Sequence, residues 1–380
     1  MNDLAQMSGG YGQYLSWIVG FLFVLTVVVF FHELGHFLVA RWCGVKVKAF
    51  AIGFGKEIWG FNDRYGTRWC LNWIPMGGYV KFIDDESAAS TPDREKFNSM
   101  SEEDRAGTFQ GKAIWQRAAI VAAGPIANFL LAIAIFGAFF ALHDVPYIAA
   151  RVGEITVGSA AEAAGMQKGD LVLSIDGAAI ETFEDMKTIV STNAGRALKM
   201  RVERKGQEVE LTATPRLDEK KGPYNSTIRE GLLGVRADAK PEDVRYKHFT
   251  PLAAIAEGVK RTKFIVDMTL SYLGKVFSGR EKADQIGGPL MIAQVSGEAV
   301  KSGLIELLNV AGVISVSIGL MNLFPIPMLD GGHLLFYAIE AIRRRPLSER
   351  TQEIGFRIGL AAVLMLFVFA TRNDLVRLFG

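Results

Sequence analysis

The stretch His32-Glu33-Leu34-Gly35-His36 directly follows residues 17–31, a run that contains no charged residue. On a helix, side chains at positions i and i+4 share one face, so both imidazoles can reach a single zinc ion. Glu33 lies beside them and could take a proton from water held at the metal. Ionisable groups at membrane depth are costly and usually functional. The placement therefore predicts hydrolysis inside a bilayer or at its edge.

The alternative interpretation is that this pattern is a chance match without a function. An HExxH sequence on a soluble helix is a weak signal, and most such His and Glu side chains are simply exposed. Burying two histidines and a glutamate among apolar residues is expensive, which favours a metal site. A third ligand elsewhere in the chain would strengthen that interpretation.

The composition indicates a protein that is partly in lipid and partly in water. The 380 residues are 50% hydrophobic, with a mean hydropathy of +0.21, yet 22% of them are charged. A net charge of +2 gives no sign of a nucleic-acid partner. Cys43 and Cys70 fit neither a zinc knuckle nor a redox pair, so we interpret them as small buried or interfacial thiols. The first forty residues contain no Lys or Arg, so we expect no cleaved signal peptide.

Four segments are predicted to span the membrane. The first includes the HELGH stretch, and the second and third contain no charged residue. The fourth has a short uncharged core at 358–371, so Arg357 would have to extend towards the membrane surface. The predicted spans are residues 14–40, 118–142, 307–329 and about 354–371.

The flanking charges predict the orientation. Residues 41–117 contain twelve Lys and Arg, four arginines lie between the last two spans, and the N-terminal flank has none. Basic loops stay in the cytoplasm, so both termini should lie outside it. The HELGH stretch and Asp330 then fall at the cytoplasmic ends of their spans, at the same depth.

Residues 143–303 should then be extracytoplasmic. The run Gly158 to Asp170, an alternating strand closed by Asp176-Gly177, a helix at 183–192 and a hairpin around Lys205-Gly206 together resemble a PDZ domain of the bacterial protease type. Such domains bind extended peptides or peptide ends at a sheet edge. The alternative is a structural β-domain without an open groove. We assign 143–237 to the PDZ-like domain and 238–303 to a connector, whose residues 251–277 predict an amphipathic helix on the outer membrane surface.

The second half of the site follows the third span. Pro325 and Pro327 in Asn322-Leu-Phe-Pro-Ile-Pro-Met-Leu-Asp330 cannot continue a regular helix. Non-helical backbone at membrane depth is tolerated only where it is buried or lines a cavity. Asp330 can supply a third zinc ligand and leave one position open, the pattern of a catalytic site. The alternative is a helix cap. His333 is the rival ligand, and we expect it to act from outside the ligand set because two histidines and one carboxylate already complete it.

HELGH in the first span and Asn-x-x-Pro-x-Pro-x-Leu-Asp-Gly in a late span together resemble the site-2 protease family of intramembrane zinc metalloproteases. Within the family, the chain is similar to the bacterial branch that contains the sigma-E regulator protease. The segments at 53–55, 75–81 and 123–128 also look like family segments. The branch often carries two tandem PDZ domains, whereas only one copy is recognisable here.

The resemblance implies a role for each matching position. His32, His36 and Asp330 would bind one zinc ion, and Glu33 would be the general base. The region 50–82 is similar to the membrane-dipping β-hairpin of the family, whose edge could pair with a substrate strand. The expected substrate-binding residues are Asn322, Pro325, Pro327 and Asn128.

The expected fold is a polytopic α-helical membrane protein with about four transmembrane helices, a membrane-associated β-hairpin region and an extracytoplasmic PDZ-like α+β domain. Residues 1–142 and 304–380 would hold the helices. The expected function is zinc-dependent cleavage of single-span membrane proteins inside the bilayer after prior truncation. As the family implies, this would be regulated intramembrane proteolysis in a bacterial inner membrane, releasing an anti-sigma factor in a stress response or clearing remnant signal peptides.

Two other functions remain open at this point. A non-catalytic metal-binding membrane scaffold could recruit partners through the PDZ-like domain, although a scaffold need not keep Glu33. A zinc or proton transporter would need polar residues continuing across the membrane, and the second span offers only Asn128. Expected partners are single-pass membrane proteins, the lipid bilayer and peptide ends, with no nucleic acid.

Overall fold

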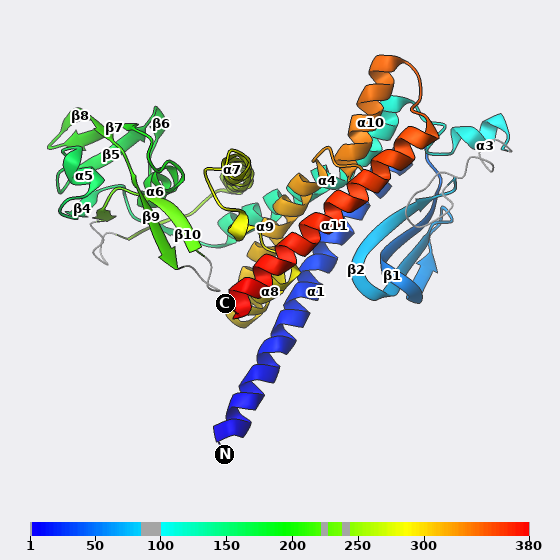
Figure 1. Cartoon of the computed structure of the whole chain (residues 1–380), viewed down its shortest axis with the longest axis horizontal. Coiled ribbons are helices and arrows are strands. Elements are labelled where there is room, and N and C mark those ends of the chain that lie inside the picture. Colours follow the sequence, from blue (N-terminus) through cyan, green and yellow to red (C-terminus); the bar gives the residue numbers. More distant parts are fainter. Residues whose placement is uncertain (1, 85–99, 222–226, 238–243, 380) are drawn as a thin grey trace. The chain divides into compact units, whose positions relative to one another are not determined.

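The computed structural model describes residues 2–84, 100–221, 227–237 and 244–379 (Figure 1). The chain divides into two compact units, which are described separately. Unit 1 consists of Met1–Phe139, Ile255–Ser278 and Ile286–Asp374, and unit 2 consists of Phe140–Ala254, Gly279–Gln285 and Leu375–Gly380.

Among the described residues of unit 1, four helices are long and apolar enough to cross a membrane. This agrees with the four spans predicted from the sequence. The third is shorter than predicted, because its helix ends at Asn322 and the chain before Asp330 is not helical. The four helices are α1 (Asn2–Trp42), α4 (Ile114–Leu142), α9 (Leu304–Asn322) and α11 (Glu349–Phe379).

Shorter helices complete unit 1, and a buried carboxylate fixes one of them, α8, to the long helix α11. The carboxylate of Asp374 in α11 accepts hydrogen bonds from the backbone N–H groups of Gly288 (2.9 Å) and Leu290 (3.1 Å), which caps the first turn of α8. Asp374 is 1% exposed, so this cap satisfies a buried charge. The shorter helices are α3 (Glu102–Ala106), α7 (Pro251–Phe277), α8 (Pro289–Ser302) and α10 (Asp330–Arg343).

A buried ion pair connects α10 to the start of α4. Arg117 Nη2 lies 3.3 Å from Glu340 Oε2, and the guanidinium also stacks over the ring of Tyr337 at 4.9 Å. The other oxygen of Glu340 accepts the backbone N–H of Leu347 at 3.0 Å. Every charge in this cluster therefore has a partner, and α10 is held in one position against α4.

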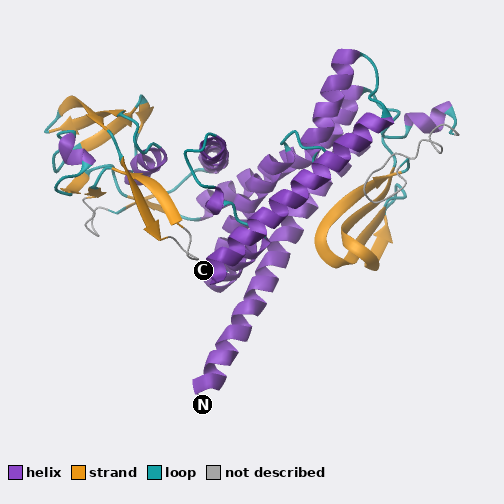
Figure 2. Cartoon of the chain, in the orientation of Figure 1, coloured by secondary structure: helices purple, strands orange, loops and turns teal. Residues whose placement is uncertain are grey.

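Unit 1 also contains a small sheet formed by β1 (Val47–Asn62) and β2 (Arg68–Phe82) (Figure 2). Residues 49–52 of β1 pair with 78–81 on one side and with 68–71 on the other, so two long strands produce a folded sheet. Its hairpin turn is tied to the end of α1, because Arg41 Nη2 lies 2.9 Å from Asp63 Oδ2. The β-hairpin predicted over 50–82 is therefore present, with longer strands.

Unit 2 is built mainly from short strands, with a four-stranded sheet in the order β6-β5-β7-β8 and three two-stranded pairs, β4-β11, β3-β12 and β9-β10. The turns at Asp176-Gly177 and Lys205-Gly206 have positive φ at both residues, as tight hairpins with a type I′ turn require. The predicted helix at 183–192 and the predicted hairpin around Lys205-Gly206 are both confirmed. The elements are β3 (Val145–Tyr147), β4 (Val152–Ile155), α5 (Ala160–Ala163), β5 (Leu171–Ile175), β6 (Ala178–Ala179), α6 (Phe183–Thr192), β7 (Leu198–Arg204), β8 (Gln207–Ala213), β9 (Arg216–Lys221), β10 (Thr227–Leu232), β11 (Val235–Ala237), β12 (Arg245–Lys247) and a 3₁₀ turn at Ala283–Gln285.

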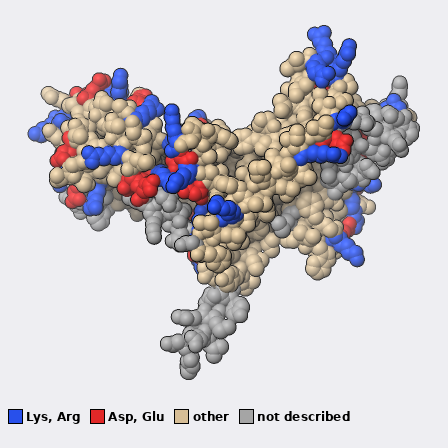
Figure 3. All heavy atoms as spheres, viewed as in Figure 1, with Lys and Arg blue, Asp and Glu red and all other residues tan. Residues whose placement is uncertain are grey.

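The two units differ in how charge covers their surfaces. On the face seen in Figure 3, Lys, Arg, Asp and Glu are spread over unit 2, whereas the middle of the unit 1 helices is almost bare of charge. Among the residues of unit 2 that the structure describes, the buried charged side chain is Asp170, which is 1% exposed. Arg204 meets it with two hydrogen bonds, from Nε to Oδ1 (2.8 Å) and from Nη2 to Oδ2 (2.7 Å). This bidentate pair fastens the loop before β5 to the end of β7.

The substitution Asp170→Asn should destabilise unit 2 by about 3 kcal/mol, because it leaves the Arg204 guanidinium without its buried partner. Burial alone raises the pKa of Asp170, but the hydrogen bonds from Arg204 and from the Gln167 N–H outweigh burial and hold the pKa below its usual value. The stabilisation is therefore present at neutral pH and is lost as the pH falls through this lowered pKa. Hydrogen exchange of the β7 amides at pH 7 measures the effect, with the exposed pair variant Glu184→Gln as control. Unchanged β7 protection in Asp170→Asn would contradict it.

Candidate metal centre

Two histidines of α1 point the same way from successive turns. The rings of His32 and His36 lie edge to face, with centroids 4.8 Å apart, and their Nε2 atoms are 3.2 Å apart. The i, i+4 spacing produces this arrangement directly, as the sequence predicted. Two nitrogen lone pairs thus converge on one point.

Asp330 reaches the same point from the start of α10. The backbone before it makes a tight turn in which the Leu329 N–H donates to the Ile326 carbonyl (3.0 Å), with Pro327 and Met328 at the centre. Met328 has a φ of +83°, as the third position of a type II turn requires. Asp330 Oδ2 lies 3.2 Å from His32 Nε2, and its Oδ1 lies 3.6 Å from His36 Nε2.

One group of potential metal ligands emerges from the described part of the chain. It consists of His32, His36 and Asp330, with one ligand atom from each lying within 4.8 Å of the others. His333 is not a member of this group, and its ring instead packs 5.5 Å from the ring of Phe356. The three residues expected from the sequence are brought together, and the rival ligand lies apart from them.

The site fits a metal ion on two structural grounds. Asp330 Oδ2 is shielded from solvent and accepts no hydrogen bond of acceptable geometry from the described residues, as expected of an oxygen that needs a cation. Gly124 of α4 faces the imidazoles, and a Cβ built on it would lie only 2.2 Å from His36 Nε2. The absence of a side chain at this position keeps open the space where the three ligands meet. Two imidazoles and one carboxylate form the ligand set of a catalytic zinc site.

The outer nitrogens of both histidines are held by α4. His36 Nδ1 lies 2.8 Å from the carbonyl oxygen of Ile120 and can donate to it, which leaves the Nε2 lone pair free for a metal. His32 Nδ1 lies 3.2 Å from the amide nitrogen Nδ2 of Asn128, so in this orientation the amide donates to the ring. Ligation through His32 Nε2 would leave the proton on Nδ1 and needs the amide turned over, so that Asn128 Oδ1, which is buried and accepts no hydrogen bond from the described residues, takes that proton.

Asn128, assigned to substrate binding from the resemblance, thus lies behind His32 and is fully buried. The backbone carbonyl of Asn128 accepts a hydrogen bond from Ser315 Oγ of α9 (2.8 Å), so the residue also joins α4 to α9. Asn322 is the last residue of α9 and is half-buried, Pro327 is half-buried in the turn, and Pro325 is exposed. The substrate-binding roles of these four residues remain predictions.

Glu33 faces the small sheet. Its carboxylate lies near the backbone N–H of Val80 in β2. Gly78 allows this approach, since a Cβ built on it would lie 3.0 Å from Glu33 Cγ and 3.0 Å from Val29 Cγ1. Residues 75–81 resemble a segment of the family, but nothing in their sequence indicates that their backbone lies beside Glu33.

Comparison with known proteins identifies the family. A model of peptidase family M50 matches residues 20–366. The chain belongs to this family. It is 49% identical to a Rhizobium meliloti (strain 1021) protein named as a zinc metalloprotease, over 95% of this chain and 96% of that one. It is 40% identical to the metalloprotease MmpA of Caulobacter vibrioides, over 96% of each, and 32% identical to the regulator of sigma-E protease RseP of Salmonella typhimurium, over 95% of this chain and 98% of that one.

These findings confirm the family and the enzyme class inferred from the sequence. The M50 protein is a zinc metalloprotease, and its apolar helices make it a multi-pass membrane protein. Proteases of this kind act on membrane proteins in a lipid environment. The group of potential ligands His32, His36 and Asp330 has a geometry that suits that activity.

The substitution Gly124→Ala should abolish stoichiometric zinc binding. The added methyl group would overlap His36 Nε2 at 2.2 Å and His32 Cε1 at 2.8 Å, so the imidazoles could not keep their positions. Zinc content per purified chain, measured by atomic emission, tests this. Gly274→Ala is the matched control, because a Cβ there meets no atom within 4 Å. Full zinc occupancy in Gly124→Ala would show that the site lies elsewhere.

The substitution Asn128→Ala should weaken zinc binding about 10- to 100-fold, because His32 would lose the group that orients its ring. Competition with a fluorescent zinc chelator measures the affinity. Asn322→Ala is the matched control and should leave zinc affinity unchanged, because Asn322 has no contact with either histidine among the described interactions. If Asn128→Ala instead kept its zinc and raised KM as Asn322→Ala does, a substrate role for Asn128 would replace the positioning role.

Proposed function

We propose that this M50 protein is an intramembrane endopeptidase that cleaves single-span membrane proteins within the bilayer. The observation that carries the proposal is the convergence of Asp330 with His32 and His36, which lie on α1, a helix long and apolar enough to cross a membrane. A scissile bond must reach these groups, so the cleaved segment enters the same apolar layer.

Each residue of the metal centre has a defined role in this proposal. His32, His36 and Asp330 hold one zinc ion, which when bound supplies a Lewis acid and lowers the pKa of water. The Ile120 carbonyl keeps His36 in the tautomer that leaves Nε2 free, and the Asn128 amide, turned so that its oxygen accepts from Nδ1, would do the same for His32. Glu33 is the single acidic residue between positions 12 and 42 of α1. It acts as the general base and moves the proton from water to the leaving amine.

A substrate helix has to be unwound before it can be cut. Its peptide carbonyls are shielded and hydrogen-bonded to each other, and breaking these bonds in lipid is costly unless others replace them. The outward edge of β2 beside Glu33 supplies replacement bonds by pairing with the extended substrate. Asn322 and the turn containing Pro325 and Pro327 hold the substrate near Asp330.

The small sheet carries the surface needed to enter the membrane. Several of its large apolar side chains are exposed, including Trp59 (62%) and Trp73 (70%). Tryptophan and tyrosine are favoured where membrane meets water, and a soluble surface rarely exposes so many aromatic groups together. The other exposed members are Phe54, Ile58, Phe61, Tyr65, Leu71 and Ile74.

Helix α7 suits the membrane surface on the other side. Ala254, Thr262 and Ile265 are buried, while Leu252 and Val259 are exposed on a different face. Charged residues such as Lys260 and Lys263 occupy the rest of the helix. A helix with separate apolar and charged faces lies in the interface rather than across the bilayer.

Unit 2 contains a groove suited to a peptide end. The groove has a volume of about 180 Å³ and lies between α6 and residues 230–235. The Leu233 carbonyl accepts the Ala161 N–H, and the Gly234 carbonyl accepts the Thr156 N–H. In a trans peptide the N–H points opposite to the C=O, so the amides of Gly234 and Val235 point away from these partners. Such amides can bind a terminal carboxylate.

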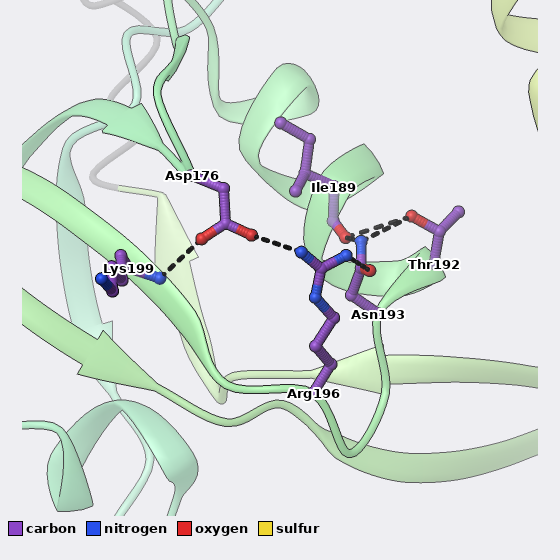
Figure 4. Close-up of polar contacts among 6 residues, drawn as sticks. All are labelled: Asp176, Ile189, Thr192, Asn193, Arg196 and Lys199. Carbon is purple, nitrogen blue, oxygen red and sulfur yellow. Dashed lines mark hydrogen bonds and ion pairs between the residues drawn. The ribbon is translucent and has the colours of Figure 1, made fainter.

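Helix α6, one wall of the groove, is fixed at its C-terminal end (Figure 4). Asp176 accepts hydrogen bonds from the Lys199 N–H (2.9 Å) and from Arg196 (3.1 Å), and Arg196 also donates to Asn193 at the helix end (3.3 Å). A wall that is already rigid favours specific binding, because little conformational entropy is lost when a ligand enters the groove. We assign the groove to the new end of a substrate that another protease has shortened.

The cellular setting follows from the charge distribution and the family. Basic loops place the metal centre towards the cytoplasm and both termini with unit 2 outside, in a bacterial inner membrane. Cleavage there would release a cytoplasmic regulator, such as an anti-sigma factor fragment in a stress response, or would clear remnant signal peptides.

Cleavage of a tagged single-span substrate, already truncated on its outer side, tests the proposal. The purified chain should cut it within the span, and Glu33→Gln should be slower by about 10²- to 10⁴-fold while keeping its zinc, because only the general base is lost. Mass spectrometry of the products locates the cut. Equal cleavage by both proteins would point to a contaminant, and cleavage outside the span would exclude an intramembrane site. A scaffold protein would keep zinc and cut nothing.

A further inference from the structure

We propose that the loop between α10 and α11 binds the phosphate headgroup of an anionic phospholipid through three consecutive arginines, Arg343, Arg344 and Arg345. Residues 343–348 are called the arginine loop below. The inference goes beyond the proposed function and does not depend on it, because lipid binding can be measured whether or not the protein cuts a substrate.

The arginine loop has a positive charge that the protein itself does not neutralise. Residues 341–348 contain three arginines and no acidic residue. All three arginines are exposed, and their side chains form no ion pair or hydrogen bond with any residue that the structure describes. Arg117, in contrast, lies 3.3 Å from Glu340. Guanidinium groups that have no carboxylate partner are suited to phosphate, because their N–H groups can donate to two of its oxygens at once.

The backbone of the arginine loop is held in one conformation. Leu347 is buried, its N–H donates to the Glu340 carboxylate (3.0 Å), and its carbonyl accepts a hydrogen bond from Gln352 Nε2 (3.1 Å). Arg344 ends α10 with a φ of +54°, and the ring of Pro346 restricts the next turn of the chain. A loop that is already fixed loses little conformational entropy when it binds an anion.

The arginine loop lies where an exposed apolar surface ends. Ile342, directly before it, is 83% exposed, and Leu335 is exposed earlier on α10. Helix α11, which follows, is long and apolar enough to cross a membrane and exposes Ile354 and Ile358. Figure 3 shows Lys and Arg atoms gathered where α10 ends, next to helices with little charge. Positive groups at such a border meet the headgroup layer of a bilayer, so we assign the phosphate to a lipid.

A lipid bound here acts on the helix that supplies the third potential metal ligand. Asp330 is the first residue of α10 and Arg343 is the last. The pair formed by Glu340 and Arg117 already holds α10 against α4. A headgroup at the arginine loop adds a second restraint, because it fixes the depth at which α10 lies in the bilayer.

The triple variant Arg343→Gln/Arg344→Gln/Arg345→Gln tests the site. Its side chains stay polar and exposed, so the fold and the zinc content should not change. Each arginine beside an anionic headgroup contributes roughly fivefold to lipid affinity, so the triple variant should lose about 100-fold. If it fails to fold, the three single variants decide, each with an expected loss of roughly fivefold.

The matched control is Lys168→Gln/Lys199→Gln/Lys205→Gln, which removes three positive charges from exposed positions of unit 2. It has the same net charge as the triple arginine variant, so it separates the arginine loop from a general effect of charge. The control should bind the lipid as tightly as the unchanged protein.

The probes are dansyl-labelled phosphatidylglycerol and phosphatidylcholine with the same acyl chains, added to each full-length protein in maltoside micelles. Energy transfer from the tryptophans of the chain to the dansyl group reports binding, and the matching unlabelled lipid competes. Excess inorganic phosphate is a further competitor, compared with chloride at the same ionic strength so that screening is equal.

The outcomes either support the site or overturn it. Preference for phosphatidylglycerol that is lost in the arginine variant and kept in the lysine variant supports the proposal. The same preference in the arginine variant would place the headgroup elsewhere, and equal binding of the two lipids to the unchanged protein would exclude a site for anionic lipid. Displacement of the labelled lipid by inorganic phosphate but not by chloride would identify a site for free phosphate and overturn the assignment to a lipid.

Discussion

The fold of unit 1 depends on one constraint: polar groups placed in an apolar helix must satisfy each other. His32, Glu33 and His36 follow fifteen uncharged residues of α1, where water is scarce. Their neighbours come from three other elements, namely the Ile120 carbonyl and the Asn128 amide of α4 and Asp330 of α10 for the two histidines, and the backbone of β2 at Val80 for Glu33. The packing of these elements around α1 follows from that need.

The same constraint explains residues that never touch the ligand atoms. Gly124 has no side chain because α4 must approach both imidazoles closely. The Pro327-Met328 turn stops the chain from continuing α9 and aims the first residue of α10 back at α1. Arg117 and Glu340 then hold α10 against α4, so the carboxylate of Asp330 has little freedom to move away from the histidines. A ligand almost 300 residues away in sequence is thereby fixed as firmly as the i, i+4 pair.

Local patterns made much of this predictable. The HELGH spacing fixed a shared helix face, two prolines indicated an interrupted span, and the Asp-Gly and Lys-Gly pairs marked hairpin turns that the structure contains. Each of these signals lies within a few residues of the feature it predicts. The contacts of Asn128 with His32 and of Val80 with Glu33 join positions 96 and 47 residues apart, and no short pattern encodes them. The pairing of residues 49–52 with two segments, 68–71 and 78–81, could not be predicted either. Strand periodicity indicates which side chains share a face of the sheet, but it does not identify the strand that pairs with them.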